Sequence, residues 1–183
     1  MIITKVIPNF LTKIECDNLL EIGKNLTLEY ASTGPETNGK LNKKIRDSEI
    51  AWIEDAVISK RIINELNLII NIKGYDIVKK ELFQFTKYGR SGHYNWHRDT
   101  DKSLNKDRSF SISIQLNDEY NGGELLYKLD DGIELQFEKG LGNLYIFTSS
   151  ILHCVKPITN GERYSIVNWF GLDEIKNLKK TLL

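Results

Sequence analysis

The sequence contains only two cysteines among its 183 residues, Cys16 and Cys154. Two thiols cannot build a disulfide framework, and no apolar N-terminal segment follows a basic start, so we expect neither disulfide stabilisation nor a signal peptide. The apolar runs are also much shorter than the ~18 residues that span a bilayer. These absences predict a soluble protein of the cytoplasm, with no membrane as partner.

The chain also has no excess of charge of either sign. Its 25 basic residues balance its 25 acidic residues. Lys43, Lys44 and Arg46 form a short basic run, which a solvated loop explains at least as well as a phosphate contact does. Because no larger basic tract exists, we do not expect nucleic acid as a partner. The length is that of one domain, residues 1–183.

Helical patterns occur in the first part of the chain. Thr12 and Glu15 form a capping-box pattern, which predicts a helix over about 12–24. Apolar residues at helical intervals predict a second helix over 48–72. Residues 30–42 are rich in turn-forming residues, which favours a surface loop over a lid. Residues 173–183 have the pattern of a short C-terminal helix.

After Gly74 the apolar residues fall mostly in short alternating runs, which are typical of strands. The clearest run is 110–116, and the glycine-containing segments 121–123 and 130–132 have the composition of turns. Helices followed by about eight antiparallel strands indicate an α+β fold. We expect a double-stranded β-helix, or jelly roll, over about 76–171, flanked by helical support in about 1–75.

His97, Asp99 and His153 are the most informative residues of the sequence. Residues two apart on an extended segment project to the same face, so His97 and Asp99 can reach one ion. Two imidazoles and one carboxylate are the facial ligand set of non-haem iron(II) sites, which leaves coordination positions open. Each residue alone is weak evidence, since a histidine near a carboxylate is more often an ordinary hydrogen-bonded pair.

Other residues near this set have simpler explanations. His93 lies four residues before His97, but the strand pattern around it does not suit a helical pair of ligands. Trp96 fits a substrate entrance and a core position about equally. For Trp169 we favour core packing, and for Cys154, which points away from its neighbour His153, a buried structural thiol.

Three further segments occur in a distinctive order with these residues. They are 122–125 (Gly-Gly-Glu-Leu), 140–147 (Gly-x-Gly-Asn-Leu-Tyr-Ile-Phe) and 153–165, which begins with His153 and ends in Arg-Tyr-Ser. With His97 and Asp99, the pattern resembles the iron(II)- and 2-oxoglutarate-dependent dioxygenases. The resemblance is to the prolyl 4-hydroxylase-like branch, with its bacterial and phage members.

The resemblance implies roles for the matching residues. His97, Asp99 and His153 match the iron ligands. Arg163 matches the basic residue that pairs with the distal carboxylate of 2-oxoglutarate, a task that suits the planar guanidinium fork. Tyr88 matches a tyrosine that often contacts this co-substrate.

Two more positions bear on the co-substrate. Ser165 lies two residues after Arg163, on the same strand face, and is expected to add a hydroxyl contact. Some relatives have another tyrosine on the strand after the metal pair, where this chain has Gln115, so that contact is open here.

The resemblance further implies an enzyme that uses Fe(2+), 2-oxoglutarate and O2, with ascorbate as an optional reductant. It is expected to hydroxylate a C–H bond of a prolyl or other residue in a peptide or protein, releasing succinate and carbon dioxide. Because Asp99 is present, hydroxylation is expected rather than halogenation. The alternatives are a free amino acid or other small molecule as substrate, or a non-catalytic barrel module. The oligomeric state has no signal in the sequence.

Overall fold

The computed structural model of the protein describes residues 2–33, 40–70, 72–79, 81–100 and 107–175. These residues form two helices and fifteen strands, and every strand pair is antiparallel. The helices are α1 (Lys13–Lys24) and α2 (Ala56–Ile69). The strands are β1 (Thr4–Ile7), β2 (Glu29–Tyr30), β3 (Arg46–Asp47), β4 (Glu49–Ile53), β5 (Tyr75–Lys79), β6 (Phe83–Tyr88), β7 (His93–His97), β8 (Phe110–Gln115), β9 (Asn121–Gly122), β10 (Leu125–Lys128), β11 (Glu134–Gln136), β12 (Leu144–Thr148), β13 (Leu152–Val155), β14 (Ile158–Asn160) and β15 (Arg163–Glu174).

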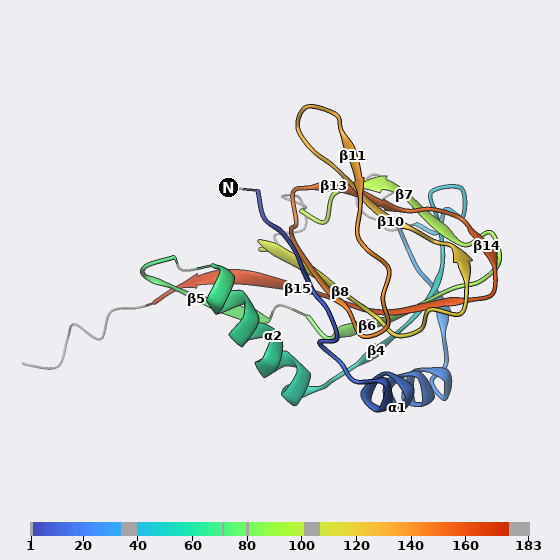
Figure 1. The fold of residues 1–183 in the computed structure, drawn as a ribbon, viewed down its shortest axis with the longest axis horizontal. Helices are drawn as coiled ribbons and strands as arrows, with labels where there is room; N and C mark the ends of the chain where they lie inside the picture. The colour runs from blue at the N-terminus through green and yellow to red at the C-terminus, as the bar shows by residue number, and fades with distance from the viewer. Residues whose placement is uncertain (1, 34–39, 71, 80, 101–106, 176–183) are drawn as a thin grey trace, which may run out of the picture.

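Two sheets form the body of the protein. The larger has the strand order β1-β12-β8-β15-β6-β4-β2, with β5 paired to β15, and the smaller has the order β11-β10-β13-β7-β3. A short pair, β14 and β9, stands apart from both. Both helices lie on one side of the sheets, next to β4 and β6 in the view of Figure 1. The predicted α+β jelly roll with flanking N-terminal helices is confirmed.

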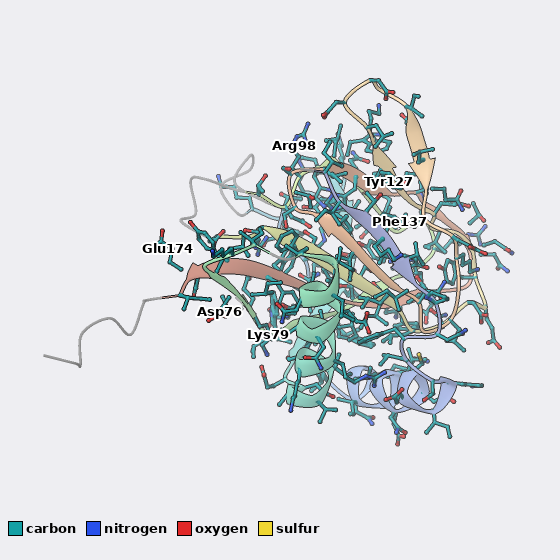
Figure 2. The ribbon with its side chains drawn as sticks, turned by 60° about the vertical axis from the view of Figure 1, so that its left-hand side comes forward. Asp76, Lys79, Arg98, Tyr127, Phe137 and Glu174 are labelled. Atoms are coloured by element: carbon teal, nitrogen blue, oxygen red, sulfur yellow. The ribbon has the colours of Figure 1, made fainter. Side chains whose placement is uncertain are left out.

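Side chains on the two faces of the larger sheet build two separate cores. On the helix side, Ile112 and Ile114 of β8 pack with residues of both helices. Between the sheets a second, aromatic-rich core contains Tyr127 and Phe137, whose ring centroids are 4.7 Å apart and which lie close together in Figure 2. Because alternate residues of a strand point to opposite faces, the same strands serve both cores.

The first helix begins where the sequence predicts. Thr12 is the N-cap, and its hydroxyl accepts a hydrogen bond from Glu15 N at 3.3 Å. The Glu15 carboxylate accepts one from Thr12 N at 2.8 Å, which completes the capping box. Gly23 of this helix lies against the Phe85 ring, since a methyl group there would be 2.2 Å from a ring carbon. The glycine thereby lets α1 pack closely on the sheet.

The prediction of one helix over residues 48–72 is wrong at both ends. β4 occupies Glu49–Ile53, where Ala51 and Ile53 are buried and Trp52 between them is 44% exposed, which is the two-residue period of a strand. The helix starts only after Asp55, whose carboxylate accepts a hydrogen bond from Ile58 N at 2.8 Å. Because both segments are rich in isoleucine, the change from the two-residue period of β4 to the helical period of α2 is not evident in the sequence.

Several other expectations differ from the structure. Residues 121–122 form strand β9, paired with β14, rather than a turn. The 130–132 turn is present and joins β10 to β11. The segment expected as helical support also contributes strands β1 to β4 to the sheets. Asp173 and Glu174, predicted to begin a C-terminal helix, belong to strand β15 instead, and 176–183 lie outside the described residues, as does the middle of the 30–42 loop. Neither described helix is long and apolar enough to cross a membrane.

Gly142 joins the N-terminal segment to the barrel and provides a test of the packing there. Its φ is +71°, and a Cβ atom would lie 2.0 Å from the Leu11 carbonyl oxygen. We expect Gly142→Ala to lower the free energy of unfolding by about 3 kcal/mol, from left-handed strain and overpacking together. Gly132→Ala is the matched control, since Gly132 has a φ of +87° but no atom within 4 Å of its Cβ position. Gly132→Ala is expected to lower the free energy of unfolding, measured with urea, by only about 1 kcal/mol. Equal losses of stability in the two variants would contradict the close packing at Gly142.

Candidate metal centre and co-substrate pocket

His97, Asp99 and His153 meet at one point between the sheets. His97 ends β7 and pairs directly with His153 of β13, while Asp99 lies two residues past the end of β7. The Nε2 atoms of His97 and His153 are 3.6 Å and 3.5 Å from the two carboxylate oxygens of Asp99. The ligand atoms of all three side chains lie within 4.8 Å of one another. This donor set and spacing fit a single metal ion.

The peptide backbone orients both imidazoles. Nδ1 of His97 is 2.7 Å from the Asn95 carbonyl oxygen, and Nδ1 of His153 is 2.9 Å from the Ile151 carbonyl oxygen. A carbonyl only accepts, so each Nδ1 carries the proton and each Nε2 presents a lone pair toward the metal position. Burial, together with the nearby His153, lowers the pKa of His97 to about 3. The His97 imidazole is therefore neutral at physiological pH, the form that binds metals.

Asp99 is held by serines that the sequence did not single out. Ser111 Oγ donates to Asp99 Oδ2 at 2.6 Å and lies 2.8 Å from Ser149 Oγ. The Asp99 amide also donates to the Ser149 carbonyl at 3.0 Å. Burial by itself raises the pKa of Asp99, but His153, His97 and the Ser111 hydrogen bond together hold that pKa below its usual range. The carboxylate is thus ionised, oriented and ready to act as a ligand.

An irregularity in β7 brings an aromatic ring onto His97. His153 pairs with His97 but Val155 pairs with Tyr94, so two residues of β7 lie opposite one residue of β13. This bulge turns Tyr94 to the same side as His97, and the two rings stack with centroids 3.5 Å apart. The Arg46 guanidinium covers the outer face of Tyr94, with Cζ 4.7 Å from the ring centroid. The stack fixes the plane of the His97 ring.

Arg163 is a buried cation without an acidic partner. It is 2% exposed, and none of the ion pairs found among the described residues includes it. Its Nη1 donates to Ser165 Oγ at 3.2 Å, and its Nε has no hydrogen-bond partner. Tyr88 pairs with Arg163 across β6 and β15, with the guanidinium carbon 5.5 Å from its ring centroid. A buried guanidinium with a free donor is a site that fits an anion.

These groups line a single cavity of about 560 Å³, within the range of small-molecule sites. The metal-binding set and the Arg163 group both border it, so a molecule inside can touch both at once. Trp52, which is 44% exposed, also lines the cavity and connects it to the protein surface. The predicted site residues that line the cavity are Tyr88, His97, Asp99, His153, Arg163 and Ser165.

Gln115 does not line this cavity. It is 2% exposed, and its side-chain amide donates to the carbonyls of Asn117 at 2.7 Å and Tyr164 at 3.3 Å. It borders instead a smaller cavity on which Arg163 also lies. The structure therefore places the Gln115 amide group away from the metal and toward the backbone.

Three other residues considered in the sequence lie outside the metal-binding group and the cavity. His93 contacts the carbonyls of Ser91 and Lys44 and is not part of the metal-binding group. Trp96 does not border the cavity and lies under the Lys128 ammonium group, 4.8 Å from its ring centroid. Cys154 is buried, as expected, and burial raises its pKa to about 11.

Trp169 is buried, as expected for core packing, but it also takes part in the site. Trp169 is 6% exposed, but it borders the cavity, and its indole N–H is buried without a hydrogen-bond partner. Arg108 covers the ring at 3.8 Å and is itself neutralised by Glu81, at 2.5 Å. The apolar sequence around Trp169 did not indicate its place on the cavity, because strand β15 faces the cavity on one side and the core on the other.

Comparison with known proteins identifies the family. The chain is 32% identical over 176 residues to a PKHD-type hydroxylase of Prochlorococcus marinus (strain MIT 9515), covering 88% of this chain and 77% of that protein. Residues 83–171 match the model of the 2OG-Fe(II) oxygenase superfamily. The chain belongs to the 2OG-Fe(II) oxygenase superfamily. The predicted resemblance to dioxygenases of the prolyl hydroxylase-like type is thus confirmed.

Other members of the superfamily extend the comparison. A PKHD-type hydroxylase of Prochlorococcus marinus (strain MIT 9301) is 32% identical over 152 residues, and the match covers 81% of this chain but only 64% of that relative. A Pseudomonas putida prolyl-4-hydroxylase superposes with a TM-score of 0.71 at 22% identity, over 92% of this chain and 91% of that one. A Trichoplax adhaerens prolyl hydroxylase gives 0.74 at 21% identity, over 92% and 83%. The solved structures establish that the fold is shared.

The serine beside Asp99 leads to a test within this 2OG-Fe(II) oxygenase site. We expect Ser111→Ala to weaken the binding of Mn(II), a stable substitute for iron(II), by about 10- to 100-fold, because outer-shell partners of metal ligands contribute that much. Ser113→Ala is the matched control. Ser113 follows on the same face of β8 and borders the cavity, but none of the hydrogen bonds found among the described residues joins its side chain to a ligand. The measurement is a Mn(II) titration of both variants. Equal Mn(II) affinities of Ser111→Ala and Ser113→Ala would contradict the role given to Ser111.

Proposed function

We propose that this protein is a non-haem iron(II), 2-oxoglutarate-dependent dioxygenase that hydroxylates a C–H bond of a prolyl or other residue in a peptide or protein. The single observation that supports it best is the cavity that joins the His97, Asp99 and His153 set to Arg163. One end can hold a metal and the other an anion. A co-substrate that chelates a metal and carries a distant carboxylate suits both ends.

In this proposal His97, Asp99 and His153 hold Fe(2+) on one face. All three side chains border the cavity, so a metal held by them would be open to co-substrate and O2 from that side. The bound metal and co-substrate supply the oxidising power, by oxidative decarboxylation of 2-oxoglutarate to succinate and carbon dioxide. The three side chains are buried and their orientations are fixed by Asn95, Ile151 and Ser111, so little reorganisation is needed when the metal binds.

Arg163, Ser165 and Tyr88 hold the co-substrate. The guanidinium binds the distal carboxylate of 2-oxoglutarate, the Ser165 hydroxyl adds a second polar contact, and the Tyr88 ring lines the wall. Because Arg163 has no acidic partner of its own, the co-substrate neutralises a buried charge when it binds. Water is excluded from this end by the aromatic core between the sheets.

The substrate enters from the side of Trp52. A peptide is favoured because the cavity lining includes two exposed residues of the N-terminal region, Ser32 and Trp52, which can contact an extended chain. The Trichoplax adhaerens neighbour is described in complex with a peptide fragment, which supports the same class of substrate. The pocket then receives one side chain at the metal.

A mass-shift screen tests this proposal. Purified protein is incubated with iron(II), ascorbate, 2-oxoglutarate and a peptide library in which proline-containing members come first. The expected result is a gain of one oxygen atom on a peptide, which disappears when 2-oxoglutarate is omitted. Oxygen gain on free amino acids alone would replace the peptide by a small-molecule substrate. Failure of the protein to bind either metal or 2-oxoglutarate in calorimetry would favour a non-catalytic barrel module.

A further inference from the structure

Arg46 is a second arginine on the large cavity that has no acidic partner among the described residues. It lines the cavity together with the metal-binding set, but none of the ion pairs found in the described part of the chain includes it. The residue is only 8% exposed. Burial of a guanidinium without a counter-ion costs free energy, which an anion bound in the cavity would offset.

The Arg46 side chain is fixed on two sides. Its Nε donates to Ser48 Oγ at 2.8 Å, and its Cζ lies 4.7 Å from the centroid of the Tyr94 ring. The backbone is also held, because Arg46 N donates to the Asn42 carbonyl at 2.9 Å. Neither Nη1 nor Nη2 of Arg46 donates in any hydrogen bond found among the described residues. The end of the guanidinium is therefore oriented and available to a ligand.

The acidic residues closest to Arg46 in the sequence pair with other cations. Asp47 Oδ1 lies 3.8 Å from Lys43 Nζ, and Glu49 Oε2 lies 3.7 Å from Lys87 Nζ. Neither of these carboxylates borders the cavity. The charge of Arg46 is thus not neutralised by its own segment.

The charges around the cavity leave Arg46 without a counter-ion even when the proposed ligands are bound. The acidic residues of the described border are Glu81, which pairs with Arg108 at 2.5 Å, and Asp99, which belongs to the metal-binding set. Under the proposed function, the negative charges of Asp99 and 2-oxoglutarate balance the positive charges of Fe(2+) and Arg163. The charge of Arg46 then remains for an anionic group of the substrate.

Arg46 is close enough to the metal-binding set to contact a bound substrate. The rings of Tyr94 and His97 stack with centroids 3.5 Å apart, and Arg46 Cζ is 4.7 Å from the Tyr94 centroid, so the guanidinium carbon is at most about 8 Å from the His97 ring. An extended peptide rises about 3.3 Å per residue, so a carboxylate bound by Arg46 belongs to a residue within about three positions of the one beside His97.

We propose that Arg46 binds a carboxylate of the substrate peptide, supplied by an acidic side chain or by the C-terminus within three positions of the hydroxylated residue. This inference deepens the proposed function and rests on it. Arginine suits the task because its planar fork binds a carboxylate through two parallel hydrogen bonds. A neutral peptide would cover the guanidinium without neutralising it, so the cavity selects against such peptides.

Matched peptide pools test this inference. Each pool has a randomised central residue that includes proline, and carries glutamate or glutamine at one of the three positions on either side. The ends are acetylated and amidated, and a further glutamine pool has a free C-terminal carboxylate. The pools compete in one reaction with iron(II), ascorbate and 2-oxoglutarate, and oxygen gain is measured by mass. We expect kcat/KM to be at least about 30-fold higher with a carboxylate than with its neutral counterpart.

Three variants assign this preference to Arg46. Arg46→Gln is expected to reduce it to about twofold or less, and Arg46→Lys, which keeps the charge but loses the planar fork, to an intermediate value. The Kd for 2-oxoglutarate of the Mn(II)-loaded variants should stay within about twofold, which excludes general damage to the site. Lys43→Gln is the matched control, because it removes an exposed cation of the same segment, and it is expected to keep the full preference.

The possible outcomes separate this inference from the proposed function. Equal oxidation of the carboxylate-containing and neutral pools by the unchanged protein would overturn the inference alone. A preference that survives in Arg46→Gln, or that is lost equally in Lys43→Gln, would do the same. Absence of oxygen gain in every pool would overturn the peptide substrate of the proposed function, and this inference with it.

Discussion

Asp99→Ala is expected to abolish metal-dependent turnover of 2-oxoglutarate. Asp99 is the only carboxylate of the described metal-binding group, and its removal leaves two imidazoles that cannot complete a triangular ligand face. Succinate formation should fall to below about 1% of the unchanged rate, a loss of more than about 2.7 kcal/mol in transition-state stabilisation. The measurement is succinate produced in the presence of iron(II), ascorbate and 2-oxoglutarate, with metal content determined on the same samples.

Asp131→Ala is the control for this loss. Asp131 lies in the exposed turn after β10, where its carboxylate accepts a hydrogen bond from Ile133 N at 3.0 Å. This variant also loses one carboxylate but is expected to keep full turnover. Thermal unfolding of both variants establishes that each is folded. Turnover by Asp99→Ala within about twofold of the unchanged protein would rule out the assigned metal centre.

Arg163→Gln is expected to raise the Kd for 2-oxoglutarate by about 30-fold or more. Truncation of one partner in a buried charge pair typically costs 2 to 5 kcal/mol, so about 30-fold is the lower end of the effect. Arg163→Lys keeps the charge but loses the planar fork, and an intermediate loss is expected. Calorimetry with the Mn(II)-loaded protein measures these affinities without turnover.

The ligand-free protein provides an internal check on Arg163. Its guanidinium is buried, has no acidic partner among the described residues, and leaves Nε without a hydrogen bond. Even a buried ion pair can often be replaced by apolar side chains of similar size without loss of stability, so removal of the unpaired Arg163 charge in Arg163→Met should retain the melting temperature of the ligand-free protein. Arg61→Gln, on the ion pair with Glu15 outside the cavity, is the control for affinity. An unchanged Kd for Arg163→Gln would contradict the co-substrate site.

The sequence was most informative where spacing alone fixes direction. His97 and Asp99 are two residues apart, and the structure brings them together with His153 although β7 ends at His97. Arg163 and Ser165 likewise share one face of β15 and contact each other. Alternation along a strand is a short-range rule, and it predicts pairs within one strand well.

The parts of the site that were missed depend on contacts between distant segments. Ser111 lies on the small polar face of the strand predicted over 110–116, and that face is buried and supports Asp99. Tyr94 reaches His97 only because of the bulge in β7, which no local pattern indicates. Arg46 appeared as part of a surface basic run, whereas β3 places it 8% exposed against Tyr94. In each case the pairing of strands, which a single sequence does not specify, decides the environment.

The helix prediction failed for a related reason. Residues 49–53 are apolar enough to extend the helical pattern of α2 backward, but they pair with β6 as a strand. Ala51 and Ile53 are both buried, Ile53 in the core that includes residues of α1 and α2, and this burial stabilises the strand more than helical propensity opposes it. A capping residue, Asp55, marked the true start of the helix and was the local signal that could have been used.

The most direct test of the account is succinate formation by the purified protein. With iron(II), 2-oxoglutarate and O2 together, the account predicts that 2-oxoglutarate is converted to succinate, and that omission of any one of the three stops the conversion. Ascorbate should sustain the rate without being required for the first turnovers. Succinate formation that continues without iron, or its absence when all three are present and bound, would contradict the assignment of the cavity to 2-oxoglutarate-dependent oxidation.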